Sequence, residues 1–328
     1  MAGKSAYNCQ QPTANSQPRI LYINYANEQY KFQQKFALMA AKKLGGFDAT
    51  KAYSPESIDE DFRKANSAIL SIKRGNGLWL WKPYIILKAL DEIREGDYVF
   101  YCDSGAFFFS SVMPLIKSMG DNDIWVSNIA FIEEEWTKPE IFSQLGITDE
   151  GIKTSGQVQG GFFLARKSEK SCAFVREWLG LCSRPELIMP LEPGEYHGEC
   201  IENREDQSLL SVLSKLRGIK AHKPPFIAPK YFRLFHPVMV LKNTVKRITG
   251  RYVPPKYTSP WGREPKRVKN VYDDIYSPCI YLHRIRRAGS VFSVIRQAAQ
   301  GLGPRMTLKI IAGWIAGSFR RKNTLPNS

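Results

Sequence analysis

A carboxylate directly after an apolar run is the first feature of this chain that could do chemistry. The run Tyr98–Cys102 is almost continuously apolar, and Asp103 follows it, with Ser104 and Gly105 to turn the chain. Such a run is typical of a strand buried on both faces, as in a parallel sheet. Ligands of open α/β sheets bind at the carboxyl ends of strands. Asp103 could therefore hold a divalent cation and, through it, a diphosphate; the alternative is that it only begins a turn or caps the next helix.

Two further groups of residues could act beside this carboxylate. Lys82 precedes Pro83, and proline is favoured in the first turn of a helix, where a lysine suits a phosphate or a sugar carboxylate. Gly160 and Gly161 would let a ligand approach the backbone closely, and Gln159 before them could contact its hydroxyls. The alternatives are a surface lysine beside a turn and a simple bulge in a strand.

Together these motifs resemble the donor-binding core of GT-A-fold glycosyltransferases, especially glycosyltransferase family 8 and related bacterial polysaccharide glycosyltransferases. In that family a Lys precedes an apolar helix, and the next strand ends in a D-x-D motif. Here Lys82, the helix expected over residues 83–93 and Asp103 follow the same order. The segments 158–168 and 204–213 are similar to two more motifs of the family, and the resemblance covers about residues 18–220.

The resemblance implies a nucleotide-sugar donor, most simply a uridine-diphosphate sugar, and a divalent cation, Mn²⁺ or Mg²⁺. The motif here is Asp103-Ser104-Gly105, so the second D-x-D carboxylate is missing. Family 8 enzymes carry a late His that binds metal or diphosphate, and His283 could supply the ligand that Gly105 does not; a lone His is also common as an ordinary polar residue. The donor and cofactor contacts expected on this basis are Lys82, Asp103, Ser104, Gln159, Gly160, Gly161, Arg284 and Arg286, with Asp103 and His283 as metal ligands.

Glu205 and Asp206 open a segment with helical apolar periodicity, expected over 206–216. An N-capping role would by itself explain Asp206. The resemblance places its counterpart beside the reacting sugar. In an inverting reaction Asp206 or Glu205 could be the general base that deprotonates the acceptor hydroxyl; in a retaining one, as in family 8, Asp206 would position or stabilise the sugar.

The net charge of +16 is concentrated at the C-terminal end of the chain. Residues 229–328 carry 20 Lys and Arg against three acids, whereas the remainder carries 27 against 28. Such a segment favours a polyanionic partner. Arg284, Arg286 and Arg287 suit a diphosphate through bidentate geometry, or an anionic membrane surface. The apolar spacing over 306–319, flanked by basic residues, predicts an interfacial amphipathic helix, or one packed on the core.

Strands alternating with helices predict an α/β fold with a mostly parallel sheet flanked by helices, GT-A-like or Rossmann-like. We expect a disordered tail over 1–17 and a nucleotide-sugar-binding domain over 18–228. An irregular basic extension over 229–328 would complete the donor site and contact a membrane. Six widely spaced cysteines and the lack of an export signal predict reduced thiols in a cytoplasmic protein, peripheral on the inner face of the membrane.

The prediction is therefore a glycosyltransferase that moves a sugar to a hydroxyl of a glycan or lipid-linked glycan in surface polysaccharide biosynthesis. The alternative is a non-catalytic protein whose basic C-terminal segment binds anionic membrane or nucleic acid. Against nucleic acid, the sequence has no zinc-finger spacing, RNA-recognition signature or clear helix-turn-helix.

Overall fold

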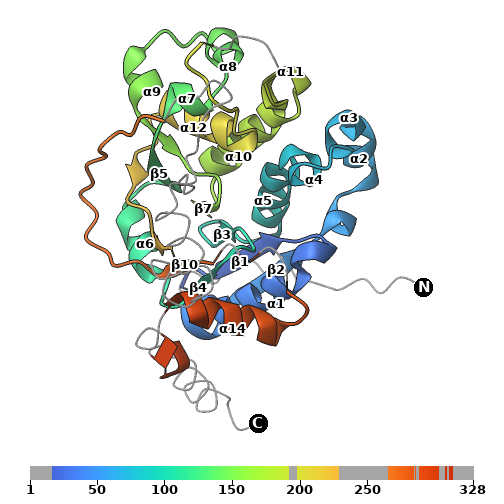
Figure 1. The fold of residues 1–328 in the computed structure, drawn as a ribbon, viewed down its shortest axis with the longest axis vertical. Helices are drawn as coiled ribbons and strands as arrows, with labels where there is room; N and C mark the ends of the chain where they lie inside the picture. The colour runs from blue at the N-terminus through green and yellow to red at the C-terminus, as the bar shows by residue number, and fades with distance from the viewer. Residues whose placement is uncertain are drawn as a thin grey trace, which may run out of the picture.

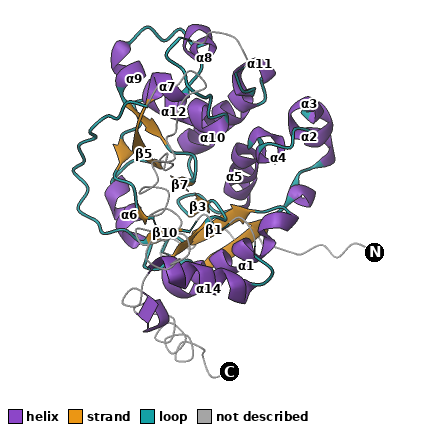
Figure 2. Ribbon diagram, viewed as in Figure 1, coloured by secondary structure: helices purple, strands orange, loops and turns teal. Residues whose placement is uncertain are grey.

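The computed structural model describes residues 17–191, 198–228, 265–283, 285, 288–302, 307–308 and 310–312. Within these ranges the chain is a mixed α/β structure built on a seven-stranded sheet and a smaller three-stranded sheet. Helices cover both faces of the larger sheet (Figures 1 and 2). The predicted fold class, an α/β protein with a mostly parallel sheet flanked by helices, is confirmed.

The large sheet has the strand order β2-β1-β3-β7-β5-β6, and β8 pairs with β5. The pairs β1–β2, β1–β3 and β5–β8 are parallel, whereas β7 lies antiparallel between β3 and β5, and β6 is antiparallel to β5. The main direction is therefore shared by β2, β1, β3, β5 and β8. The strands are β1 (Ile20–Tyr25), β2 (Ala49–Tyr53), β3 (Tyr98–Cys102), β5 (Ile124–Ile132), β6 (Gly156–Val158), β7 (Phe162–Arg166) and β8 (Ala221–His222).

The small sheet attaches the C-terminal part of the chain to the core. Its central strand β10 (Ile280–Leu282) is antiparallel to β4 (Ala106–Phe108) and parallel to β9 (Phe226–Ile227). An isolated antiparallel bridge also joins Phe131 of β5 to Arg267. The described part of the predicted basic extension thus packs on the core, and β10 brings His283 next to the turn that follows β3, since the His283 N–H donates to the Gly105 carbonyl at 3.0 Å.

The helices form two groups on opposite faces of the large sheet. Helix α10 contacts both α5 and α12, and α1 contacts α14 on the other side (Figure 1). The helices are α1 (Lys31–Ala40), α2 (Glu60–Ala65), α3 (Ser67–Leu70), α4 (Gly75–Leu78), α5 (Trp81–Glu92), α6 (Met113–Met119), α7 (Glu133–Trp136), α8 (Pro139–Gln144), α9 (Glu150–Thr154), α10 (Glu169–Cys182), α11 (Pro185–Ile188), α12 (Asp206–Leu216) and α14 (Val291–Leu302), with short turns η1 (Glu28–Tyr30), η2 (Ala41–Gly45) and η3 (Pro55–Ser57).

Strand β3 is buried on both faces, as its apolar run predicts. Val99 and Tyr101 belong to the core cluster that includes residues of α5, α10 and α12, whereas Phe100 and Cys102 belong to the cluster on the α1 and α14 side. All four are 0% exposed. Successive side chains of a strand point to opposite faces, so this one strand joins the two cores and fixes the position of Asp103 at its end.

Three sequence-based predictions need correction. Helix α5 begins at Trp81, so Pro83 is its third residue; this costs no hydrogen bond, because the first N–H groups of a helix have no partner within it. Gly160 and Gly161 do not form the bulge within a strand that is their alternative explanation: residues 159–161 lie between β6 and β7, which starts at Phe162. Asp206 is the first residue of α12 and not its N-cap, a position held by Glu205 without a side-chain cap bond.

Several predictions lie outside the described residues. They concern Arg284, Arg286, Arg287, the N-terminal tail, residues 229–264 and most of the helix expected over 306–319. Among the helices in the part of the chain that the structure describes, none has the length and apolar content to cross a bilayer. The five cysteines in those ranges are free and buried.

Candidate active site

Asp103 lies at the carboxyl end of β3, and main-chain bonds hold it there. Its N–H donates to the Gly161 carbonyl at 2.9 Å, and its own carbonyl accepts from Ala106 at 3.1 Å, which closes the predicted turn. The Tyr101 hydroxyl donates to Asp103 Oδ1 at 2.5 Å. The Asp103 side chain is 41% exposed, so it is held in place and still open to a ligand.

Ser104, a predicted donor contact, is bonded to the neighbouring strand. Its side chain is buried, and its hydroxyl donates to the Tyr25 carbonyl at 2.6 Å. This bond ties the turn after β3 to the end of the neighbouring strand β1. Ser104 therefore helps to position Asp103, and its proton is already committed to a backbone acceptor.

Lys82 and Asp206 form a buried ion pair beside Asp103. The distance from Lys82 Nζ to Asp206 Oδ2 is 2.6 Å, and each side chain is 4% exposed. Lys82 Nζ also lies 4.0 Å from Asp103 Oδ1 and 5.5 Å from the centre of the Tyr101 ring. The structure thus joins residues from α5, β3 and α12 in one cluster, which agrees with the grouping that the sequence motifs predict.

Burial and charge act in opposite directions on this ion pair. Burial raises the pKa of Asp206 to about 6, although the Lys82 charge and hydrogen bond lower it and the Asp103 charge raises it further. Burial would lower the pKa of Lys82, but the charges of Asp206 and Asp103 raise it above its usual value. At neutral pH both groups are ionised, with one cation between two carboxylates. The cluster therefore has an excess negative charge and suits a cationic ligand.

The predicted glycine pair packs directly against this cluster. A Cβ on Gly160 would lie 3.2 Å from Asp206 Oδ2 and 3.3 Å from Lys82 Nζ, and one on Gly161 would lie 3.3 Å from Asp103 Oδ2. These contacts are tighter than ordinary van der Waals distances. The two glycines are therefore needed for close approach of the turn to the charged groups.

Glu205 is buried, and its charge is balanced by an arginine from another part of the chain. Arg74 Nε donates to Glu205 Oε1 at 2.6 Å, and Arg74 Nη2 donates to Glu202 at 2.5 Å. Burial raises the pKa of Glu205 to about 7, with the Arg74 charge and hydrogen bond opposing it. Its backbone is left-handed, with φ of 47°, which is strained for a residue other than glycine.

The segment that leads into α5 is strained in the same way. Positive φ values occur at five consecutive positions, from 51° to 94°, at Gly75, Asn76, Gly77, Leu78 and Trp79. The ring of Trp81 stacks on Tyr25 at 3.7 Å between centroids, and its Nε1 donates to the Gly75 carbonyl at 2.9 Å. Strained backbone of this kind is concentrated at functional sites. Here it sets the direction in which α5 starts and so the position of Lys82.

The NH₂ group of the Gln159 side chain is bonded to β5. Its side chain is buried and donates to the Ser127 hydroxyl at 2.5 Å, and its N–H donates to the Ser127 carbonyl at 2.9 Å. Gln207, which was not among the predicted site residues, takes the position next to Gly160 instead: its Oε1 accepts from the Gly160 N–H at 2.9 Å. The position of Gln207 directly after Asp206 is the one sequence feature that could have identified it as a site residue. No comparable feature of the sequence identifies Arg74 or Tyr101.

Asp103 fits a divalent cation that arrives together with phosphate groups. Mg²⁺ is usually held by one or two carboxylates plus substrate phosphates and waters. Asp103 Oδ1 accepts from Tyr101, and its side chain is partly exposed. Across the described residues there is no group of three His, Cys, Asp or Glu side chains placed to hold a metal by themselves. A cation at Asp103 would therefore take most of its ligands from substrate phosphates and waters.

The contacts of His283 do not fit the predicted role of metal ligand. Its Nδ1 accepts a hydrogen bond from the Ile285 N–H at 3.0 Å, so the proton of the neutral ring is on Nε2. Burial lowers the pKa of His283 to about 4, which keeps the ring neutral. Nε2 is buried and has no hydrogen-bond partner among the described residues. A protonated Nε2 has no lone pair for a metal, and it can only donate.

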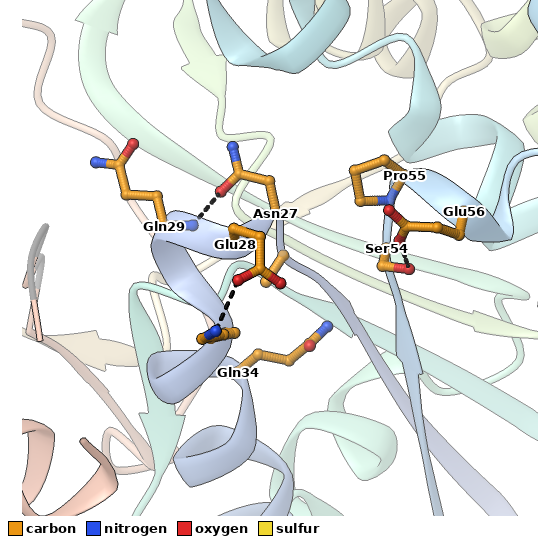
Figure 3. A pocket seen from close by; sticks show the side chains of 9 residues that line it. Asn27, Glu28, Gln29, Gln34, Ser54, Pro55 and Glu56 are labelled. Carbon is orange, nitrogen blue, oxygen red and sulfur yellow. Dashed lines mark hydrogen bonds and ion pairs between the residues drawn. The ribbon is translucent and has the colours of Figure 1, made fainter. Parts of the chain in front are cut away.

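A pocket of about 590 Å³ opens at the carboxyl ends of β1 and β2, on the same edge of the sheet as Asp103. Figure 3 shows Asn27, Glu28 and Gln29 on one side of it and Ser54, Pro55 and Glu56 on the other. A second pocket of about 410 Å³ shares Pro55 and Glu56 with it. Parallel neighbouring strands place their carboxyl ends together, so the larger pocket and the charged cluster face the same side of the molecule.

No protein-family model matches this sequence, and no curated protein matches it either. Among solved structures, the chain is similar in fold to the galactosyltransferase LgtC in complex with donor and acceptor sugar analogues, at 14% identity over 94% of this chain and 98% of LgtC, with a TM-score of 0.41. It is similar to the bifunctional glycosyltransferase WbbM at 9% identity over 93% of this chain and 53% of WbbM, with a TM-score of 0.42.

A third similar structure is mouse xyloside xylosyltransferase 1, at 8% identity over 81% of this chain and 97% of that enzyme, with a TM-score of 0.40. All three proteins are glycosyltransferases, the class that the motifs resemble. At this level of identity and of TM-score, none of them assigns an activity to this chain.

Proposed function

We propose that this protein is a glycosyltransferase that uses a nucleotide-sugar donor. The observation that carries the proposal is the buried pair of Lys82 and Asp206 beside Asp103 and the Gly160–Gly161 turn. These groups come from four separate segments of the chain and meet at the carboxyl end of β3. Burying charges costs free energy, so a cluster that serves no ligand would be an expensive way to stabilise a fold.

The donor would occupy the edge of the sheet from the pocket to the charged cluster. The nucleoside fits the pocket after β1 and β2, where the carboxylates of Glu28 and Glu56 can accept hydrogen bonds from ribose hydroxyls. The diphosphate would then reach Asp103 through a divalent cation, Mg²⁺ or Mn²⁺. A uridine diphosphate sugar is the donor that the sequence motifs favour, and a glycan or lipid-linked glycan of a surface polysaccharide is the acceptor.

The chemistry of such a site is mainly positioning and stabilisation of charge. A bound cation would act as a Lewis acid on the departing diphosphate. Lys82 offsets negative charge at the same place, and its pair with Asp206 directs its ammonium group toward Asp103. In an inverting reaction Asp206 or Glu205 would take the proton of the acceptor hydroxyl. In a retaining reaction Asp206 would instead stabilise positive charge that develops on the sugar.

Calorimetric titration with uridine diphosphate, in the presence of Mg²⁺ or Mn²⁺ and in EDTA, tests the donor site. We expect binding that the cation strengthens and that Asp103→Asn weakens. Screening of nucleotide sugars for hydrolysis and transfer would then identify the sugar. If the full-length protein bound no nucleoside diphosphate under either condition, the transferase proposal would be wrong.

The proposal includes a peripheral contact with an anionic membrane through the C-terminal region. No acidic residue follows Asp274, whereas nine Lys and Arg do. Helix α14 packs on α1 through buried Val294 and Ala298, while Phe292 and Ile295 are 73% and 39% exposed. Exposed apolar side chains in a basic segment fit the interface of an anionic bilayer, where a lipid-linked acceptor would lie.

A further inference from the structure

A buried chain of hydrogen bonds leads from Glu133 to the glycine turn of the site. Gln157 Nε2 donates to Glu133 Oε1 at 3.3 Å, and Gln207 Nε2 donates to Gln157 Oε1 at 2.7 Å. Gln207 Oε1 in turn accepts from the Gly160 N–H at 2.9 Å. Glu133 and Gln157 are 0% exposed. The proposed reaction does not use the side chain of Glu133. The burial of this charged residue at the end of the hydrogen-bond series therefore needs a separate explanation.

The side-chain amides of Gln157 and Gln207 can each take only one orientation. Gln157 Nε2 faces the Glu133 carboxylate and the Trp136 carbonyl, which lies at 3.0 Å, and both of these groups only accept hydrogen bonds. The Gln157 oxygen must therefore point to Gln207 and meet its NH₂ group. This leaves the Gln207 oxygen directed at the Gly160 N–H. Rotation of either amide by 180° would bring two oxygens or two NH groups together.

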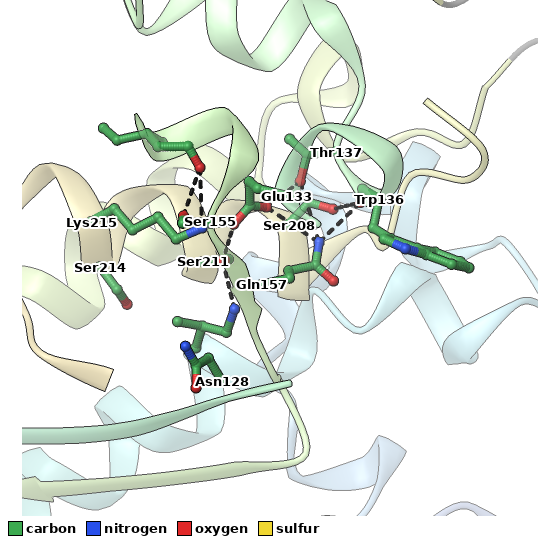
Figure 4. Close-up of polar contacts among 12 residues, drawn as sticks. Asn128, Glu133, Trp136, Thr137, Ser155, Gln157, Ser208, Ser211, Ser214 and Lys215 are labelled. Carbon is green, nitrogen blue, oxygen red and sulfur yellow. Dashed lines mark hydrogen bonds and ion pairs between the residues drawn. The ribbon is translucent and has the colours of Figure 1, made fainter. Parts of the chain in front are cut away.

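The same carboxylate also fixes the strand that enters the turn. The Ser211 hydroxyl donates to Glu133 Oε2 and accepts from the Val158 N–H at 2.7 Å. Lys215 Nζ lies 2.5 Å from Glu133 Oε2, and the Thr137 hydroxyl donates to Oε1 at 2.5 Å. Figure 4 shows Glu133 at the centre of these contacts, between α12 and β6. One buried charge thus orients both the backbone at Val158 and, through two amides, the backbone at Gly160.

We propose that Glu133 is a positioning residue of the active site: through Gln157 and Gln207 it holds the Gly160–Gly161 turn against Lys82, Asp206 and Asp103. The role rests on the proposed function in so far as the turn lines the donor-sugar site. Glu133 itself touches none of the charged groups of the site. A neutral, apolar core at this place would pack as well, but it would leave the amide of Gln207 free to rotate.

The first test is hydrogen–deuterium exchange of the full-length protein, read on peptides that contain residues 156–161. In Glu133→Gln the new amide can present its oxygen to Gln157 or to Lys215 and Ser211, but not to both. We expect exchange at the Gly160 segment to rise at least about tenfold, as the loss of one buried charged hydrogen bond implies. Glu177→Gln, which removes a partly exposed pair with Arg217 near the end of α12, is the matched control and should leave this segment unchanged.

The second test separates positioning from general stability. We expect Gln157→Leu and Glu133→Gln to lower kcat for sugar transfer or donor hydrolysis at least about tenfold, with uridine diphosphate affinity within about twofold of wild type. Unchanged exchange at 156–161 in Glu133→Gln would overturn the inference. So would a parallel loss of nucleotide affinity and thermal stability without a change in kcat. If exchange responds as expected but no nucleotide binds to the wild type, the positioning role stands and the proposed function fails.

Discussion

Lys82 and Asp206 are separated by 124 residues in the sequence, yet their side chains form a 2.6 Å ion pair that is almost completely buried. The pair joins the start of α5 to the start of α12, and Gly160 packs against both of its charged atoms. Each partner makes the burial of the other tolerable. The site therefore depends on this pair for its stability as well as for its charge.

Replacement of Lys82 tests that dependence. Lys82→Met keeps the length of the side chain but leaves Asp206 as an unpaired carboxylate in the core. We expect the free energy of unfolding at pH 7 to fall by about 3–5 kcal/mol, measured by urea denaturation. The control is Lys88→Met on the same helix, whose partner Asp59 is 65% exposed; it should cost less than about 1 kcal/mol. Equal effects of the two changes would contradict a special role for the buried pair.

Asp103 should behave in the opposite way, with a large effect on activity and a small one on stability. Its side chain is partly exposed, so Asp103→Asn removes charge without leaving a buried partner unpaired. We expect turnover to fall by at least about 100-fold, because the group that would hold the cation is lost. The free energy of unfolding, measured by thermal denaturation, should change by less than about 1 kcal/mol. Near-normal transfer by Asp103→Asn with the identified donor would rule out this carboxylate as the cation site.

The raised pKa of Glu205 predicts a pH dependence of stability. Its folded-state pKa of about 7 lies above the ordinary value of 4.5, so the folded protein binds the proton more tightly than the unfolded chain does. The contribution of Glu205 is therefore complete below pH 4.5 and is lost as the pH rises through about 7. Glu205→Gln lacks this titration. Between pH 4.5 and about 7, the free energy of unfolding of the wild type relative to that of Glu205→Gln should fall by roughly 2–4 kcal/mol. Denaturation at several pH values measures this difference, and parallel pH profiles of the two proteins would contradict the prediction.

Much of the site could be predicted because its parts follow local patterns. The apolar run before Asp103, the helix pattern after Lys82 and the apolar periodicity after Asp206 each identify an element and the polar residue near its end. Period-2 and period-3.6 patterns depend only on neighbouring residues, so one sequence is enough to recognise them. The order of the elements along the chain then supplied the resemblance.

The contacts between these parts could not be predicted in the same way. Lys82 meets Asp206 because α5 and α12 both pack against α10, an arrangement that no local pattern indicates. Glu133 begins an acidic stretch that resembles a solvated helix, and only tertiary packing buries it. The position of the proton on the His283 ring is determined by one hydrogen bond from the Ile285 N–H, a detail of backbone geometry. Long-range pairing and donor–acceptor orientation therefore had to come from the structure.

Gly160 offers a direct test of the close approach at the site. In Gly160→Ala the new Cβ would crowd Asp206 Oδ2 and Gln207 Cβ, at 3.2 and 3.1 Å. We expect a loss of about 1–3 kcal/mol in stability and a lower kcat, because the ion pair must shift. Gly180→Ala is the control: it is in the exposed part of α10, has no atom within 4 Å of the new Cβ, and should stabilise the protein by up to about 1 kcal/mol. A Gly160→Ala enzyme with full activity would show that the turn has more space than the contacts indicate.

The membrane contact can be tested through the exposed side chains of α14. A double change, Phe292→Ser with Ile295→Ser, removes exposed apolar surface of the helix and leaves buried Val294 and Ala298 unchanged, so the fold should be retained. We expect binding to vesicles that contain phosphatidylglycerol to weaken by at least about tenfold, with weak binding to pure phosphatidylcholine in both proteins. Val271→Ser is the control, since Val271 is 86% exposed but lies in the segment beside β5, away from α14. Wild-type binding that does not depend on anionic lipid, or that the double change leaves intact, would show that α14 is not the contact and that its exposed side chains serve another partner.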